Sequence, residues 1–126
     1  MLHSIAISAA VETPIYRQLY DQILSKILKG ELLPGTSLPS IRVVARELRI
    51  SIITVKKTWE MLEREGCIYT VVGKGTFVSD FSGRDLMLKK RGMITDKLAE
   101  DLRYYKSLNI SLEELTAIIS QLYKKI

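Results

Sequence analysis

The sequence predicts a mainly α-helical fold with one small β-hairpin, an α+β arrangement in two parts. Three observations predict it. Three short segments with helical spacing of apolar residues occupy the first half of the 126-residue chain, a glycine-centred run of alternating residues follows them, and two longer helical stripes fill the remainder. Three helices and a hairpin in this order form a winged helix-turn-helix, and the last two helices form a C-terminal tail.

The first helix is expected to begin after Thr13 and Pro14. Threonine commonly caps a helix N-terminus, and proline in the first turn sacrifices no hydrogen bond. Apolar residues then recur every four positions up to Ile27, and Gly30 supplies a stop. A short apolar run over residues 5–11 precedes this helix, and the chain's only histidine, His3, lies in an N-terminus that is expected to be mobile.

Two further helices are expected to begin at Ser40 and Ser51. Serine is a favoured N-cap, because its side chain accepts a hydrogen bond from a free backbone N–H group. The earlier of these helices repeats apolar residues at i, i+3, i+4 and i+7. The later one gathers its apolar side chains around Trp59, leaves Ile53 on another face and ends at Gly66.

A β-hairpin is expected over residues 67–78. Strand-like residues alternate on both sides of Gly73, Lys74 and Gly75, and glycines at a hairpin tip accept the positive φ angles that tight turns need. No complete phosphate-loop motif surrounds these glycines, so a nucleotide site is not expected. This hairpin is the predicted wing.

The chain is expected to divide into a domain over residues 1–78, a polar linker over residues 79–83 and a helical region over residues 84–126. One long helix is expected to run up to Asn109, which breaks it. Ser111, with a glutamate three residues later, forms a capping box that begins the final helix.

Charge and composition restrict the class of protein. The formal net charge is +5 with a pI near 9.4, which favours an anionic partner. Five basic side chains and one acidic side chain lie within residues 40–57, so the excess is concentrated on the second and third helices. With a single cysteine, Cys67, and a single histidine, neither a disulfide, a metal site, a cofactor nor catalysis is expected.

No signal peptide and no apolar run of about 20 residues, as a membrane span requires, is evident in the sequence. The protein is therefore expected to be cytoplasmic, soluble and without a membrane partner.

The second and third helices offer a candidate nucleic-acid interface. A stripe of exposed arginines that includes Arg42 is common on solvated helices and does not by itself indicate nucleic acid. Lys56 and Lys57 add a second basic face, at the positions where a recognition helix contacts phosphates and base edges. Ile53 lies opposite the core stripe and would pack on a thymine methyl group, unless it is one of the scattered exposed apolar residues of ordinary surfaces. Ile52 is expected to pack at the core edge.

The region from Pro14 to Val78 resembles the GntR family of bacterial transcription regulators. The resemblance rests on a combination of motifs: Pro14-Ile15-Tyr16 with Gln18-Leu19, Gly30-x-Leu32-x-Pro34-Gly35, Leu38-Pro39-Ser40-x-Arg42, Ser51-x-x-Thr54-Val55, Leu62-Glu63-x-Glu65-Gly66 and Gly73-x-Gly75-Thr76-Phe77-Val78. The short tail resembles the YtrA subfamily, whose members carry about two helices in place of a large effector-binding domain.

The resemblance implies that Arg42 binds a DNA phosphate, that residues 51–57 enter the major groove and that the wing tip meets the minor groove. The family commonly has arginine or asparagine where Ile52 or Ile53 stands, so we expect the operator of this protein to differ from those of its relatives. Thr58 and Trp59 replace the usual alanine and tyrosine, which we interpret as a repacked core. The expected DNA-binding residues are Arg42, Ser51, Ile52, Ile53, Thr54, Lys56, Lys57, Gly73, Lys74 and Gly75.

The tail is expected to form a homodimer. Segments of about 40 residues seldom fold without a partner, and two amphipathic helices cannot bury their own apolar stripes. Pairing with a second chain would bury them and present two recognition helices to an inverted-repeat operator. The expected interface residues are Ile94, Leu98, Leu102, Tyr105, Leu115, Ile119 and Leu122.

These observations fit best a homodimeric regulator of transcription that binds double-stranded DNA sequence-specifically. We expect it to act as a repressor. One alternative is an adaptor that uses the winged domain to bind protein and has no affinity for DNA. Another is a small-molecule enzyme, for which the sequence offers no catalytic constellation. The operator, the regulated genes and any small-molecule effector are not evident from the sequence.

Overall fold

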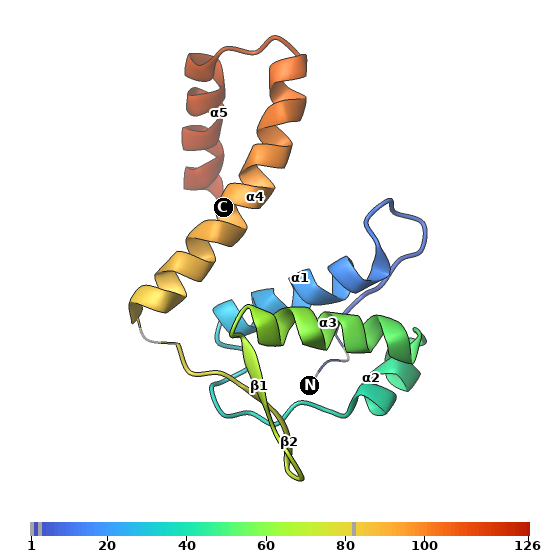
Figure 1. Cartoon of the computed structure of the whole chain (residues 1–126). Coiled ribbons are helices and arrows are strands. Elements are labelled where there is room, and N and C mark those ends of the chain that lie inside the picture. Colours follow the sequence, from blue (N-terminus) through green and yellow to red (C-terminus); the bar gives the residue numbers. More distant parts are fainter. Residues whose placement is uncertain (1, 3, 82) are drawn as a thin grey trace. The chain divides into compact units, whose positions relative to one another are not determined.

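The computed structural model describes residues 2, 4–81 and 83–126, and it divides the chain into two compact units, Met1–Leu86 and Met87–Ile126. The predicted fold class is confirmed (Figure 1). In chain order the elements are α1 (Ile15–Leu28), α2 (Ile41–Leu48), α3 (Ile52–Arg64), β1 (Ile68–Val71), β2 (Gly75–Val78), α4 (Gly83–Ser107) and α5 (Leu112–Lys125).

The core of the first unit forms where α1 and α2 pack against α3. Leu19 and Ile23 of α1 are fully buried, as are Val55 and Leu62 of α3. The four-residue spacing in α1 and the seven-residue spacing in α3 place these side chains on one face of each helix, which is why the sequence pattern identified them. Thr58 is also fully buried, and its hydroxyl donates to the Tyr16 carbonyl, or to the Thr54 carbonyl, over 3.1 Å.

The predicted serine caps are present, but the predicted threonine cap is wrong. The Ser40 hydroxyl accepts from the Val43 N–H over 3.2 Å. Ser51 accepts in the same way from the Thr54 N–H over 3.0 Å. At α1 the N-cap is Pro14, without a side-chain hydrogen bond, and Thr13 lies one residue outside the helix.

The wing is an antiparallel hairpin anchored on its outer edge. Tyr69 pairs with Phe77 across β1 and β2, and their rings stack with centroids 5.7 Å apart. The other edge of β2 pairs with the loop before α2, where the Leu38 N–H donates to the Thr76 carbonyl over 2.8 Å. The Val78 N–H donates to the carbonyl of Thr36 over 2.9 Å in the same segment. These bonds hold the wing against the α2 side of the unit.

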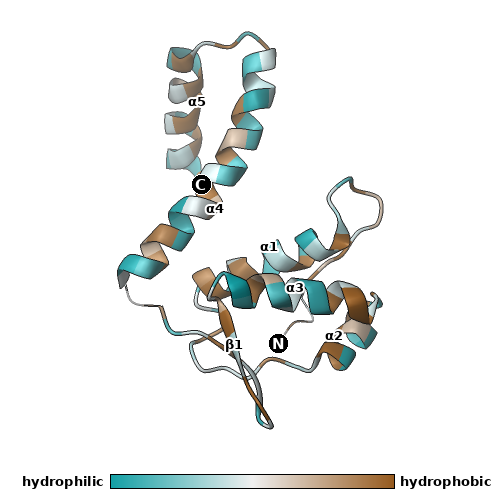
Figure 2. Ribbon diagram, in the orientation of Figure 1, coloured by the Kyte–Doolittle hydropathy of each residue, from teal (hydrophilic) through white to brown (hydrophobic). Residues whose placement is uncertain are grey.

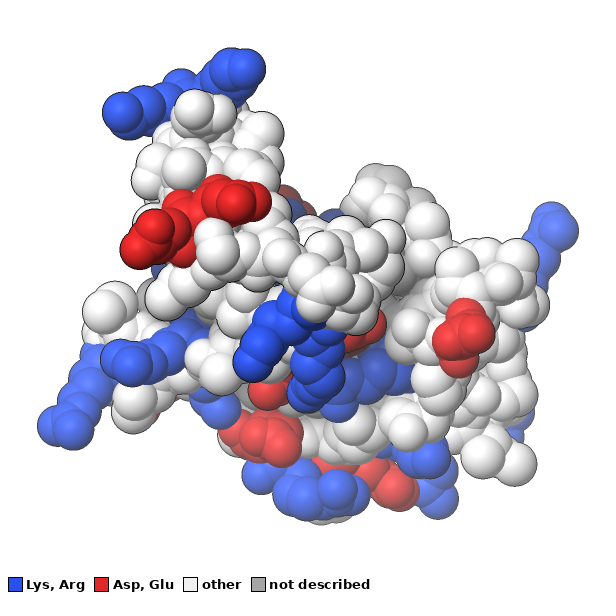
Figure 3. All heavy atoms as spheres, turned by 90° about the horizontal axis from the view of Figure 1, so that it is seen from above, with Lys and Arg blue, Asp and Glu red and all other residues white. Residues whose placement is uncertain are grey.

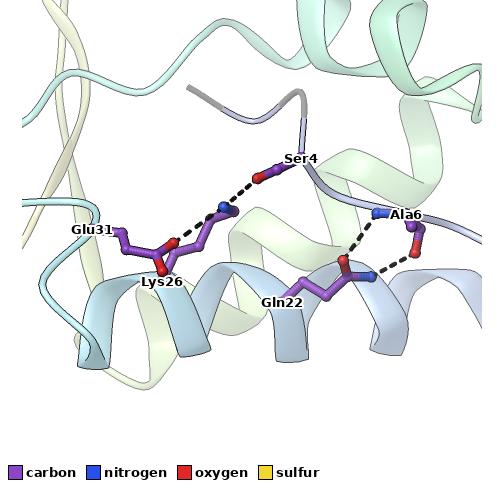
Figure 4. Close-up of polar contacts among 5 residues, drawn as sticks. All are labelled: Ser4, Ala6, Gln22, Lys26 and Glu31. Carbon is purple, nitrogen blue, oxygen red and sulfur yellow. Dashed lines mark hydrogen bonds and ion pairs between the residues drawn. The ribbon is translucent and has the colours of Figure 1, made fainter.

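The N-terminal segment is packed against α1, so the expectation of a mobile N-terminus is wrong for its described residues. Leu2 and Ile5 are buried in the core. The Gln22 side-chain amide both accepts from the Ala6 N–H over 3.0 Å and donates to the Ala6 carbonyl over 2.8 Å. Lys26 donates to the Ser4 hydroxyl and pairs with the Glu31 carboxylate, as Figure 4 shows. His3 lies outside the described residues.

The second unit is a helical hairpin that consists of α4 from Met87 onward and α5. Asn109, at φ 60°, reverses the chain after α4, and the Ser111 hydroxyl accepts from the Glu114 N–H over 3.1 Å. No described residue of either helix is buried. Figure 2 shows hydrophobic segments along both helices. The unit therefore carries apolar stripes without a core of its own.

Candidate nucleic-acid interface

The turn between α2 and α3 fixes how α3 is presented. Arg49 adopts the left-handed conformation (φ 57°, ψ 46°), which allows the Ile50 N–H to donate to the Ala45 carbonyl over 3.0 Å. Ser51 then caps α3 directly. Because α3 is held from behind by Val55, Thr58, Trp59 and Leu62, its opposite face is rigidly displayed to solvent.

The displayed face of α3 begins with two isoleucines. Ile53 is 79% exposed, which agrees with its predicted position away from the core. Ile52 is 45% exposed, so its predicted packing at the core edge is wrong. Thr54 is half-buried, and its hydroxyl lies 2.7 Å from that of Ser51. Lys56 is exposed on the same helix.

Lys57 has a protein neighbour that sequence reasoning missed. Its Nζ lies 3.8 Å from the centre of the Tyr16 ring, in a cation–π contact that joins α3 to α1. No local signal reveals this contact, because the two residues come together only when the helices pack. Lys57 therefore supports the position of α3 besides carrying charge near the displayed face.

The N-terminus of α2 supplies a second group of donors. Arg42 lies in its first turn and is exposed, with Arg46 one turn later, also exposed. The first turns of α2 and α3 both carry free backbone N–H groups and no acidic side chain. A helix N-terminus without acidic residues is a favourable place for a phosphate group.

The wing tip is exposed and needs its glycines. Gly73 and Gly75 have φ angles of 79° and 125°, which side chains rarely adopt, and the Lys74 N–H closes the turn on the Val71 carbonyl over 2.9 Å. Lys74 itself is exposed. Val72 is 97% exposed. Sequence reasoning missed this exposure, because the residue type of a strand-like position beside a turn does not indicate whether its side chain is buried.

The described residues offer little support for other chemistry. No group of three or more metal-binding side chains occurs among them. In the described part of the chain, no helix is both long and apolar enough to cross a membrane. Cys67 is buried. In the face seen in Figure 3, basic and acidic side chains are interspersed and form no single charged field.

Comparisons with known proteins agree with this geometry. The family described as "Bacterial regulatory proteins, gntR family" matches residues 15–78. The HTH-type transcriptional repressor YtrA of Bacillus subtilis (strain 168) is 35% identical over 118 residues, which are 94% of this chain and 91% of that protein.

Two solved structures extend the comparison to each part of the chain. YtrA from Sulfolobus acidocaldarius, a GntR-family transcription factor, is 36% identical with a TM-score of 0.55, covering 97% of this chain and 98% of its own. The AraR DNA-binding domain in complex with operator ORR3 is 30% identical with a TM-score of 0.52, covering 59% of this chain and 89% of its own. The chain therefore belongs to the GntR family of bacterial regulatory proteins, with the short helical tail of its YtrA subfamily.

Proposed function

We propose that this protein is a homodimeric transcription repressor that binds an inverted-repeat operator in double-stranded DNA. The observation that carries the proposal is the first half of α3, where Ile53 and Lys56 are exposed on a helix whose opposite face is fully buried. A helix held in this way enters a major groove without being reordered. The bound AraR domain supports DNA as the partner.

Each part of the interface has a separate role in the proposal. Arg42 and the N-terminus of α2 contact the phosphate backbone and position the unit. Residues 51–57 lie in the major groove, where Ile53 packs on a thymine methyl group and Lys56 contacts a phosphate or a base edge. Gly73, Lys74 and Gly75 reach the neighbouring minor groove, because glycines permit close approach and the lysine adds charge.

The proposed dimer forms through the second unit. Its apolar side chains are exposed in the single chain: Ile94 by 61%, Leu98 by 44%, Ile119 by 46% and Leu122 by 51%. A surface of this kind on two neighbouring helices marks a protein interface. Pairing also brings two α3 helices to one operator. The dimer would act in the cytoplasm, the compartment that holds bacterial DNA. Leu102, Tyr105 and Leu115 complete the proposed interface.

An adaptor that binds protein remains the second candidate, because Ile52 and Ile53 at the start of α3 and Val72 at the wing tip expose apolar surface. Selecting duplexes from a random pool, and then titrating the winning sequence at several salt concentrations, separates the two. A DNA-binding protein should select an inverted repeat, with a log–log salt slope of about −0.9 per phosphate contact. A protein with no duplex affinity at low salt would favour the adaptor and refute the proposal.

A further inference from the structure

We infer that two copies of α4 pair antiparallel, and that Arg91 of each copy faces the partner's Asp101 and so sets the register of the dimer. This inference rests on the homodimer proposed above and adds its geometry. It starts from two charged residues that interrupt an otherwise apolar seam.

The seam follows α4 at alternating intervals of four and three residues, the spacing of a helix that packs along another helix. Its members are Met87, Arg91, Ile94, Leu98, Asp101 and Tyr105. Met87 is 70% exposed, Arg91 is exposed and Asp101 is half-buried. Covering this seam with an apolar partner would bury two uncompensated charges, which is costly. The partner must therefore offer opposite charges at two places.

Arg91 and Asp101 do not satisfy each other within one chain. They are separated by ten helical residues, or about 15 Å along the axis. In the part of the chain that the structure describes, neither takes part in an ion pair. Each is therefore available to a second chain.

A second copy of α4 in the antiparallel direction meets this requirement. If the two helices are related by a two-fold axis at the level of Asp96, the seam residues pair as Met87 with Tyr105, Arg91 with Asp101 and Ile94 with Leu98, each twice. Apolar groups then face apolar groups, and both charges are compensated. Asp96 itself lies off the seam, because it is two residues from both Ile94 and Leu98, or about 200° around the helix.

Other arrangements of the same two helices leave the charges unpaired. In a parallel pair, Arg91 would face a second Arg91 and Asp101 a second Asp101, and like charges at such positions are unfavourable. Sliding the antiparallel pair by one heptad would bring Arg91 against Ile94 or against Leu108. The charge pattern therefore selects both the direction and the register.

The space beside the seam fits the same partner. A groove of about 460 Å³ lies between the end of α4 and α5. Its lining is mostly apolar and includes Tyr105, Leu115, Ile118 and Leu122. In the inferred register the partner's Met87 lies beside Tyr105 at this groove, where a flexible methionine side chain is well suited to fill an irregular gap.

Exchanging the charges tests the pairing. Arg91→Asp alone and Asp101→Arg alone should each weaken dimerisation about 10- to 100-fold, because two symmetric pairs become repulsive. The double variant Arg91→Asp/Asp101→Arg should recover to within about threefold of the wild-type protein. The readout is the dissociation constant from sedimentation, with circular dichroism to confirm helix content. Arg103→Asp and Glu100→Arg, which change the same charges outside the seam, are the matched controls.

A distance measurement tests the direction without altering the seam. With Cys67→Ser as background, spin labels at Lys106→Cys should lie about 30 Å apart in the antiparallel dimer, and about half that or less in a parallel one. Failure of the two proposals is distinguishable. A wild-type protein that is monomeric at micromolar concentration overturns the homodimer itself. A stable dimer overturns only the inferred pairing if its spin labels lie at the short distance, or if the single charge reversals leave its dissociation constant unchanged.

Discussion

Ile53 and Leu62 lie on the same helix, α3, and differ in burial. Ile53 is 79% exposed at the start of α3, whereas Leu62 is fully buried near its end. An exposed aliphatic side chain contributes little to the free energy of unfolding, whereas a buried one contributes much. The same substitution at these two positions should therefore affect different measurements.

Replacing Ile53 with alanine should relax the preference for one operator base pair by about 1 kcal/mol, because a contact with a thymine methyl group is lost. Thermal stability should barely change. Competition binding against operators altered one base pair at a time measures the preference. Leu62→Ala is the control, and should cost about 2–5 kcal/mol of stability. An Ile53→Ala protein with unaltered base preference would rule out the proposed readout.

Arg42→Ala should weaken binding to all duplexes and reduce the salt slope by about one, because a phosphate contact contributes affinity without sequence information. Binding isotherms at several salt concentrations measure both effects. Arg103→Ala removes the same type of charge from α4 and should leave the slope unchanged. If the two variants behave alike, α2 does not contact the DNA backbone.

Tyr20 makes stability depend on pH in the alkaline range. Burial, and then the negative charge of Glu65, raise the pKa of Tyr20 to about 12 from 10.0. The folded state favours the neutral phenol. The contribution of Tyr20 to the free energy of unfolding is therefore complete below pH 10 and is lost as the pH rises from 10 towards 12. Denaturant unfolding at pH 9 and pH 11 should show a smaller decrease for Tyr20→Phe than for the wild-type protein. Equal decreases would contradict the assignment.

Among the elements, the N-terminal segment depends most on side-chain amides. Gln22 pairs with both backbone groups of Ala6, and Gln18 accepts from the Ser8 N–H over 2.9 Å and donates to the Ser8 carbonyl over 2.8 Å. These bonds continue along α1 and keep Leu2 and Ile5 in the core.

The variant Gln18→Ala/Gln22→Ala should lower the free energy of unfolding by about 1–3 kcal/mol, since five modest hydrogen bonds are lost: one pair to Ala6, one pair to Ser8 and one to the Thr13 carbonyl. Hydrogen exchange should become faster at the amides of Ala6 and Ser8, and denaturant unfolding measures the total. Gln121→Ala, on an exposed position of α5, is the matched control. Unchanged exchange at Ala6 would show that Leu2 and Ile5 hold the segment without the amides.

For the molecule as a whole, the two units differ in how they are stabilised. The first has a core of side chains from α1, α2, α3 and the wing, and Phe81 packs against that core. The second has no buried residue in either helix. The first unit therefore has the means to fold alone, while the proposed dimer would cover the exposed apolar side chains of the second.

A protein ending at Leu86 should remain folded and monomeric, and should bind the full operator on the order of a hundredfold more weakly than the complete chain. The reason is that a half-site held alone lacks the effective concentration supplied by a linked second domain. Light scattering and operator titration measure these properties. The complete chain and an isolated half-site serve as controls, because both proteins should bind the half-site equally. Tight operator binding by the truncated monomer would argue against the dimer mechanism.

The sequence by itself determined those features that depend on neighbouring residues. Ser40, Ser51 and Ser111 cap their helices because a serine reaches N–H groups only three residues away. Gly73 and Gly75 mark the wing because local backbone sterics require them there. Periodicity also indicated the buried face of each helix of the first unit.

Only the tertiary structure decided what depends on residues far apart in the chain. The cation–π contact between Lys57 and Tyr16 exists because α3 packs on α1, and the exposure of Ile52 depends on where that packing ends. The N-terminal segment is ordered because α1 offers amides at the right spacing, which no local pattern in residues 4–11 reveals. Such contacts follow from packing geometry, and a one-dimensional pattern contains no information about distance between elements.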